Sequence, residues 1–244
     1  MDSFISNSNV LEKTISEGYQ RVLEKINVAA QKSGRSSDDV TLVGVSKFFP
    51  DTYAEMAYTL GLLHLGENKV QELLQKKEAL ETRGVFPFWH LIGTLQTNKV
   101  RHIVGKTELI HSVDTLTLLN EIQKRSLSQD DVTNILLQVN ISEEESKHGF
   151  RKEEIEEVFC YAQENASHIS LQGLMTMAPL GAKAEASIPI FEETKELFDS
   201  LGKIAKTKDT WKSLSFGMSQ DYEEAILCGS THVRVGTAIF GVRK

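Results

Sequence analysis

Lys47 stands at the end of a short apolar run, residues 43–46, and is the first candidate for chemistry in this sequence. If that run is a buried strand, the stem of Lys47 is partly enclosed, and desolvation lowers the pKa of its ammonium group. A lysine with a lowered pKa is partly neutral near pH 7 and can attack an aldehyde to give a Schiff base. The alternative is a lysine whose side chain extends from the strand end into solvent.

Two glycine-containing segments near the C-terminus have the composition of an anion site. Gly217 and Ser219 stand just before a predicted helix, and Gly236 and Thr237 follow the last predicted strand. Glycine lets backbone N–H groups approach an oxyanion, and the two hydroxyl groups add donors. Taken separately, Ser219 can be a helix N-cap and Gly236 a turn residue. Together they predict a phosphate site.

Arg234 lies two residues before Gly236 in a short apolar run, so the strand period of two points both residues to the same side. An inward cation needs a partner, which is either a carboxylate such as Asp114 or Glu67 or a ring nitrogen or phosphate of a ligand. A Schiff-base lysine, a phosphate site and a cation directed at a ring describe a site for a phosphorylated heteroaromatic aldehyde. Pyridoxal 5′-phosphate (PLP) fits that description.

The elements that must position these residues alternate along the chain. Short apolar runs predict strands at residues 40–46, 63–66, 88–92, 108–112, 134–140, 169–176, 213–216 and 232–235. Helical patterns follow at residues 51–62, 69–81, 97–104, 116–126, 152–164, 188–205 and 220–227, after an opening helix at 10–32. This alternation predicts parallel strands joined by crossover helices.

Eight such units in 244 residues favour a single closed (β/α)8 TIM-type barrel with an extra N-terminal helix. An open doubly wound sheet is the rival, but no GxGxxG follows a strand and the sequence has no GxxxxGK[ST] motif. In a barrel the chemistry belongs at the C-terminal ends of the strands, which is where the candidate residues stand. We expect one domain over residues 1–244.

Composition and charge exclude several classes of protein. The formal net charge of −7, with acids and bases interspersed, gives no basic field for nucleic acid. Cys160 and Cys228 form neither a CxxC pair nor a disulfide framework, and no metal site is predicted. No apolar stretch approaches the roughly 20 residues of a membrane-spanning helix, and the first twelve residues lack a basic targeting region. We therefore expect a cytoplasmic location.

Ordered motifs over nearly the whole chain carry a family resemblance. They are Val45-Ser46-Lys47, Gly66-Glu67-Asn68 with Val70-Gln71-Glu72, Trp89-His90-Leu91-Ile92-Gly93, Ser146-Lys147-His148-Gly149, Gly173-Leu174-Met175-Thr176-Met177, Phe216-Gly217-Met218-Ser219 with Asp221, and Val233-Arg234-Val235-Gly236. In these the sequence resembles the pyridoxal-phosphate homeostasis proteins, whose fold is similar to the barrel domain of alanine racemase.

The resemblance implies roles for individual residues. Lys47 would hold PLP as an internal aldimine, and Arg234 would face the pyridine nitrogen. The phosphate would lie against Ser219, Gly236, Thr237 and the backbone of Met218, while Asn68 would lie near the Schiff base and Met175 and His90 would line the pocket. The resemblance also implies PLP-dependent apoenzymes as partners. The sequence leaves a monomer or a weak homodimer open.

An arginine at the ring nitrogen disfavours the pyridinium form, which makes PLP a strong electron sink, so carbanion chemistry is weakened. We therefore expect a protein that stores or delivers PLP and influences vitamin B6 and amino-acid balance, as the resemblance implies, without established turnover. Two alternatives stay open at this point. One is a single-domain PLP-dependent amino-acid racemase, and the other is a barrel aldolase that uses Lys47 directly on a sugar phosphate.

Overall fold

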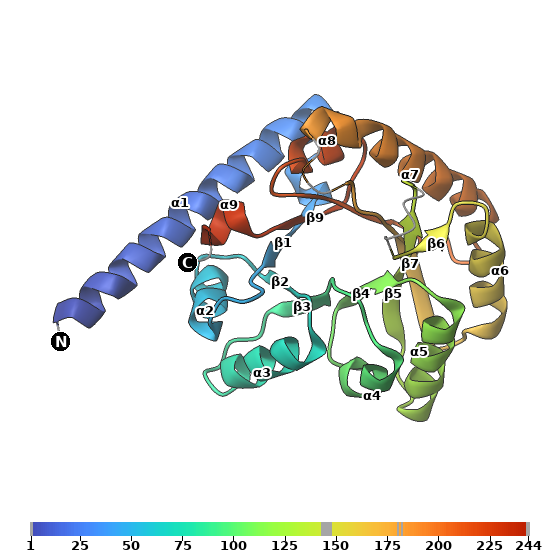
Figure 1. Ribbon diagram of the computed structural model, residues 1–244, viewed down its shortest axis with the longest axis horizontal. Coiled ribbons are helices and arrows are strands. Elements are labelled where there is room, and N and C mark those ends of the chain that lie inside the picture. Colours follow the sequence, from blue (N-terminus) through green and yellow to red (C-terminus); the bar gives the residue numbers. More distant parts are fainter. Residues whose placement is uncertain (1, 143–147, 180, 182, 243–244) are drawn as a thin grey trace.

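The predicted strands form a closed, all-parallel barrel in the computed structural model (Figure 1). They are β1 (Thr41–Val45), β2 (His64–Glu67), β3 (Phe88–Leu91), β4 (Leu109–Val113), β5 (Thr133–Asn140), β7 (Ile169–Met175), β8 (Ser213–Met218) and β9 (His232–Val235). The sheet order is β4-β3-β2-β1-β9-β8-β7-β5, and pairing between β4 and β5 closes it. The predicted (β/α)8 barrel is therefore confirmed over the open sheet. The structure describes residues 2–142, 148–179, 181 and 183–242.

Helices cover the outside of the barrel (Figure 1). They are α2 (Asp51–Thr59), α3 (Val70–Glu81), α4 (Val100–Ile103), α5 (Leu116–Ser128), α6 (Ile155–Asn165), α7 (Ala184–Ile204), α8 (Tyr222–Leu227) and α9 (Thr237–Phe240). Helix α5 illustrates their construction. The Thr115 hydroxyl caps its first turn by accepting a hydrogen bond from Leu118 N at 3.2 Å, and Leu118, Leu119 and Ile122 form its buried stripe.

The main hydrophobic core lies between the barrel and these helices. Outward-facing strand residues such as Leu65, Leu91 and Ile110 pack there against the buried stripes of the helices. The alternate residues of each strand face the barrel interior, where they are also enclosed. Burial on both faces explains why the strands are nearly continuous apolar runs in the sequence.

Helix α1 (Asp2–Lys32) runs along the outside of the barrel beside α8 and α9 (Figure 1). Ile15, Tyr19, Val22 and Ile26 supply its buried face. The helix begins at Asp2, before the expected residue 10, because the residues that precede the first apolar turn are helical too. No helix in the described part of the chain is long and apolar enough to cross a membrane.

Two short elements were not predicted from the sequence, and one predicted helix is divided into two shorter pieces. The two-residue strand β6 (Phe150–Arg151) pairs with the end of β5, and the single turn α9 follows β9. The predicted helix at 97–104 is a 3-10 turn, Thr97–Lys99, followed by α4. These pieces are shorter than the window over which a hydrophobic period can be recognised.

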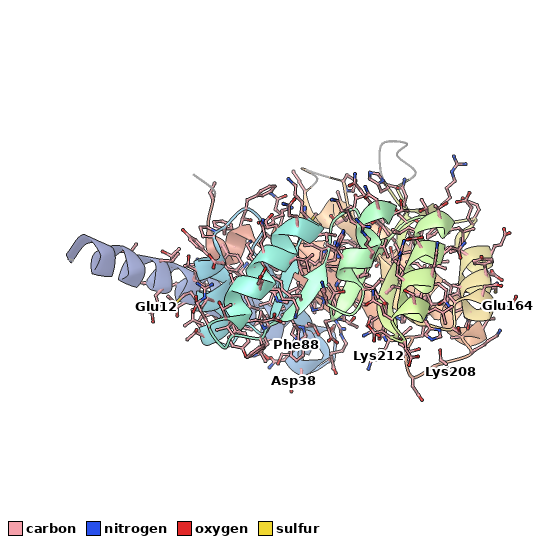
Figure 2. All side chains as sticks on the ribbon, turned by 90° about the horizontal axis from the view of Figure 1, so that it is seen from below. Glu12, Asp38, Phe88, Glu164, Lys208 and Lys212 are labelled. Carbon is pink, nitrogen blue, oxygen red and sulfur yellow. The ribbon has the colours of Figure 1, made fainter. Side chains whose placement is uncertain are left out.

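Because all the strands are parallel, their N-terminal ends share one end of the barrel. Phe88 begins β3, Lys212 precedes β8 and Asp38 precedes β1, and all three lie along the same edge of the molecule in Figure 2. The residues that follow the strands, Lys47 among them, are therefore gathered at the opposite end.

Candidate functional site

A cavity of about 470 Å³ opens at the C-terminal ends of the barrel strands. Seven of the nine predicted site residues line it: Lys47, Asn68, Met218, Ser219, Arg234, Gly236 and Thr237. They come from the ends of β1, β2, β8 and β9 and from the segments that follow. The barrel thus brings together residues as far apart in the sequence as Lys47 and Thr237, which are separated by 190 positions.

Asn68 reaches the cavity because the backbone packs closely beneath it. Gly93 follows β3, and a Cβ atom at this position would lie 2.4 Å from the Asn68 carbonyl oxygen. Only glycine permits that approach of the two chain segments. Close packing against Asn68 therefore explains why the last residue of the Trp89–Gly93 motif is glycine.

The segment after β8 is held in a fixed loop by Asp221. One carboxylate oxygen of Asp221 accepts a hydrogen bond from Met218 N at 2.7 Å, and the other accepts from Ser187 Oγ at 3.0 Å. Gly217 has a φ of +92°, and a Cβ atom there would lie 2.5 Å from the Ala225 side chain. The loop conformation thus requires glycine at this position.

The two predicted phosphate segments contact each other. Gly236 N donates a hydrogen bond to Ser219 Oγ at 3.1 Å, which joins the loop after β8 to the turn after β9. Thr237 begins α9 directly beyond Gly236 and is exposed on the cavity wall. The Ser219 and Thr237 hydroxyl groups therefore lie on one side of the cavity, next to the Met218 and Gly236 N–H groups, which donate here to Asp221 and Ser219. Hydroxyl and N–H groups are the donors that suit a phosphate.

Arg234 points into the barrel, as the strand period predicts, and is 4% exposed. Its guanidinium donates to Ser215 Oγ at 2.5 Å and to the Thr176 carbonyl oxygen at 3.1 Å. In the described part of the chain no carboxylate forms a salt bridge with it, so the alternative of Asp114 or Glu67 as partner is not what the structure shows. Burial lowers the pKa of Arg234 to about 10, and Asp221 partly offsets this, so the side chain stays cationic near pH 7.

His90, which the sequence predicts as a pocket-lining residue, lies deeper in the barrel than the residues that line the cavity. Its Nε2 is 2.9 Å from His64 Nδ1, and its Nδ1 is 2.9 Å from His111 Nε2. His111 Nδ1 in turn is 2.8 Å from Ser215 Oγ, the acceptor for Arg234. Burial lowers the pKa values of His90 and His111 well below the usual range, so both are neutral. His90 therefore belongs to a hydrogen-bonded chain that ends beneath Arg234.

Met175, the other predicted pocket-lining residue, also lies deeper than the residues that line the cavity. It is fully buried and packs with Leu109 and Leu136 in a small apolar cluster separate from the main core. Met177, two residues further along, lines the cavity instead. The strand period correctly gives the inward direction of both methionines but not their depth in the barrel.

Further residues line the cavity without having been predicted. Gln138 on β5 donates to the carbonyl oxygen of His148 at 2.9 Å, and both residues line the cavity. His148 Nδ1 also lies 3.4 Å from Asp114 Oδ2, and burial raises the pKa of that carboxyl group. Alternate residues of β5 face the barrel interior, and this alternation could have identified Gln138 from the sequence. Of the segment 146–149, Ser146 and Lys147 lie outside the described residues.

The described residues include no group of three His, Cys, Asp or Glu side chains placed to hold a metal ion. What the cavity offers is an amine at one strand end, a buried cation below it, and a set of hydroxyl and amide donors on one side. That donor set suits an organic ligand that carries an aldehyde and a phosphate.

Comparison with known proteins agrees with this description. Residues 21–244 match the family model for the alanine racemase N-terminal domain. A pyridoxal phosphate homeostasis protein from Aquifex aeolicus is 42% identical over 228 residues, which cover 93% of this chain and 98% of that protein. Its counterpart in Escherichia coli K12 is 34% identical and covers 94% of this chain and 97% of that protein. The chain therefore belongs to the alanine racemase N-terminal domain family and, within it, to the pyridoxal phosphate homeostasis proteins.

Solved structures show the same fold. PipY of Synechococcus elongatus with PLP bound is 30% identical, with a TM-score of 0.77, over 90% of this chain and 100% of PipY. Alanine racemase of Corynebacterium glutamicum is 16% identical with a TM-score of 0.63, over 91% of this chain and 61% of the racemase, which shows a likeness of fold alone. The chain thus spans the whole of the PipY chain but only part of the racemase.

Proposed function

We propose that this protein binds PLP in the cavity at the barrel mouth, holds it as a Schiff base on Lys47, and takes part in intracellular vitamin B6 homeostasis and amino-acid balance without catalytic turnover. The observation that carries the proposal is the convergence of Lys47, Arg234, Ser219 and Gly236 on one cavity. The PLP bound by PipY and the names of the curated relatives support it.

The covalent step needs only Lys47 and the aldehyde. The neutral amine of Lys47 bonds to the aldehyde carbon, the carbonyl oxygen leaves as water, and a C=N bond remains. Ser219, Gly236, Thr237 and the Met218 backbone would hold the phosphate, with Asn68 near the new bond. PLP supplies an electrophilic aldehyde and an aromatic ring that can accept electrons.

Arg234 is the reason for proposing storage or delivery rather than turnover. An arginine that faces the ring nitrogen cannot accept a proton from that nitrogen. Its positive charge also disfavours the pyridinium form, in which the nitrogen is protonated. The hydrogen bonds to Ser215 Oγ and the Thr176 carbonyl oxygen hold the guanidinium inside the barrel, where it lines the cavity. This arrangement supports a site that retains PLP while weakening carbanion chemistry.

The test is the visible absorbance of the purified protein with PLP, followed by borohydride reduction and mass analysis of the peptide that carries Lys47. We expect an adduct on Lys47 that is absent in Lys47→Ala. Lys69→Ala is the matched control, because Lys69 is an exposed lysine near the same turn, with its ammonium 5.5 Å from the centre of the Phe48 ring. An absence of band and adduct in the wild-type protein would overturn PLP as the ligand and leave the aldolase alternative.

Turnover is tested separately by incubating the PLP-loaded protein with common amino acids in deuterium oxide. The proposal expects no α-proton exchange on a timescale of seconds. Exchange at that rate would overturn the absence of turnover in favour of the racemase alternative.

We further propose that the protein is a single domain over residues 1–244, is located in the cytoplasm, and is a monomer or a weak homodimer. In this proposal it passes PLP to PLP-dependent apoenzymes. Mixing the loaded protein with an excess of such an apoenzyme tests the last point, since the expected result is activation of the apoenzyme faster than by the same concentration of free PLP. Equal rates would contradict direct transfer.

A further inference from the structure

The four residues Ser46 to Phe49 form a tight turn that carries Lys47. Phe49 N donates to the Ser46 carbonyl oxygen at 3.0 Å, so Lys47 and Phe48 occupy the two central positions. Phe48 has a φ of +66°, in the left-handed region that glycine favours. A non-glycine residue held there costs on the order of 1–3 kcal/mol, so contacts from outside the turn must hold it.

Lys76, on the barrel-facing side of α3, supplies one such contact. Its ammonium group donates to the Ser46 carbonyl oxygen at 2.8 Å, to Glu67 Oε1 at 2.7 Å and to Glu72 Oε1 at 2.9 Å. A lysine ammonium has three donors, and each of them has an acceptor here. The Lys76 side chain is 7% exposed and that of Glu67 is fully buried, whereas that of Glu72 is 21% exposed, at the edge of the set.

The two carboxylates that bind Lys76 also bind the turn. Glu67 Oε1 accepts a hydrogen bond from Ser46 Oγ at 2.6 Å, on the N-terminal side of Lys47. Glu72 Oε1 accepts from Phe48 N at 2.6 Å, on the C-terminal side. The residues before and after Lys47 are therefore both fixed to one largely buried ionic cluster, Glu67–Lys76–Glu72.

We propose that the Glu67–Lys76–Glu72 cluster is a positioning device for Lys47, which fixes the backbone on both sides of this residue so that its amine meets the ligand aldehyde in reacting geometry. The inference rests on the proposed function of Lys47. It also assigns a role to Glu67 and Glu72, which the Gly66-Glu67-Asn68 and Val70-Gln71-Glu72 motifs contain and which do not line the cavity.

The physical chemistry supports positioning over a purely stabilising role. A buried ion pair is often no more stabilising than apolar residues of the same volume, because desolvation offsets the attraction between the charges. A covalent reaction, in contrast, is sensitive to misplacement of the reacting atom by about 1 Å, which can cost on the order of 100-fold in rate. A cluster that holds Phe48 in its left-handed conformation, next to the reacting lysine, prevents such a misplacement.

The experiment compares two ligands on Glu72 variants. PLP can bond to Lys47, whereas pyridoxine 5′-phosphate carries an alcohol in place of the aldehyde and reports only on noncovalent binding in the same cavity. Glu72→Met removes the acceptor for Phe48 N, and Glu72→Gln keeps an oxygen acceptor there. Glu81→Met is the matched control, because Glu81 lies on the same helix and, among the described residues, pairs only with the partly exposed Lys77.

We expect Glu72→Met to slow Schiff-base formation and weaken PLP binding by about tenfold or more, the scale of one hydrogen bond to a charged group. Pyridoxine 5′-phosphate affinity should change by less than about twofold, and Glu72→Gln should restore most of the PLP reaction. Ser46→Ala, which removes only the hydroxyl donor to Glu67, is a second variant that should slow the reaction in the same direction if Glu72→Met folds poorly.

Two results would overturn the inference while leaving the proposed function intact. One is an unchanged PLP reaction in both Glu72→Met and Ser46→Ala. The other is an equal loss for both ligands, which would mean that the cluster merely supports the cavity. A wild-type protein that forms no adduct on Lys47 would overturn the proposed function, and the inference with it.

Discussion

Replacing Glu67 with glutamine should change how the stability of this protein depends on pH. Glu67 is fully buried, and burial raises its pKa to about 7 although Lys76 and Ser46 stabilise the ionised form. Its Oε2 has no hydrogen-bond partner among the described residues, which adds to the cost of the charge. Glutamine keeps an oxygen acceptor for Lys76 and Ser46 but cannot ionise.

The sign and size of the effect follow from linkage. In the unfolded chain the pKa of Glu67 returns to about 4.5, so between this value and about 7 the folded state binds more protons than the unfolded state. The stabilising contribution is complete below about pH 4.5 and is lost as the pH rises through about 7. At about 1.4 kcal/mol for each unit of pKa, the loss amounts to about 3 kcal/mol.

The assay is urea unfolding of the wild type and Glu67→Gln at about pH 5 and about pH 8.5. The difference between the two proteins isolates Glu67, because histidine titration contributes equally to both. The wild type should lose about 2.5 kcal/mol more than Glu67→Gln over this range, because a small part of the loss already occurs below pH 5. Glu81→Gln, which alters a partly exposed carboxylate on α3, should behave like the wild type. Parallel pH profiles for wild type and Glu67→Gln would refute the reasoning.

Three other substitutions test the cavity and the buried residues of the barrel interior. Arg234→Ala should alter the absorbance of the bound PLP without abolishing the Schiff base, and an unchanged spectrum would argue against a guanidinium directed at the ring. Ser219→Ala should weaken PLP retention by roughly 1–2 kcal/mol, measured as a dissociation constant, and unaltered affinity would remove Ser219 from the phosphate site. Burial lowers the pKa of His232 to about 4, so the folded state resists its protonation and stability falls as the pH drops below about 6.5. His232→Asn should flatten this acid limb in urea midpoints measured from about pH 7 to pH 4, and an equally steep limb would contradict a neutral His232.

The fold, and the end of the barrel that carries the site, could be predicted from the amino-acid sequence. Runs of residues buried on both faces alternate with amphipathic helices, and this pattern has few solutions other than a parallel barrel. Parallel strands place all their C-terminal residues at one end, so Lys47, Asn68, Ser219 and Arg234 could be assigned to one site before any contact was known.

The tertiary structure alone decided how deep each inward residue lies. His90 and Met175 face inward as the strand period requires, but Ile92 and Met177, which lie two residues further along the chain and just beyond the strands, reach the cavity instead. A period of two gives the side of a strand and not its height, which depends on the stagger between neighbouring strands.

The contacts of Lys76 were also beyond the sequence. Helix periodicity cannot show that a lysine on α3 is buried, nor that its three donors meet the Ser46 carbonyl oxygen and the carboxylates of Glu67 and Glu72. These partners come from a turn, a strand and a helix, and only the packing of α3 against the ends of β1 and β2 brings them within hydrogen-bonding distance. The sequence patterns thus predict which residues face the site, whereas the three-dimensional packing determines which of these residues contact one another.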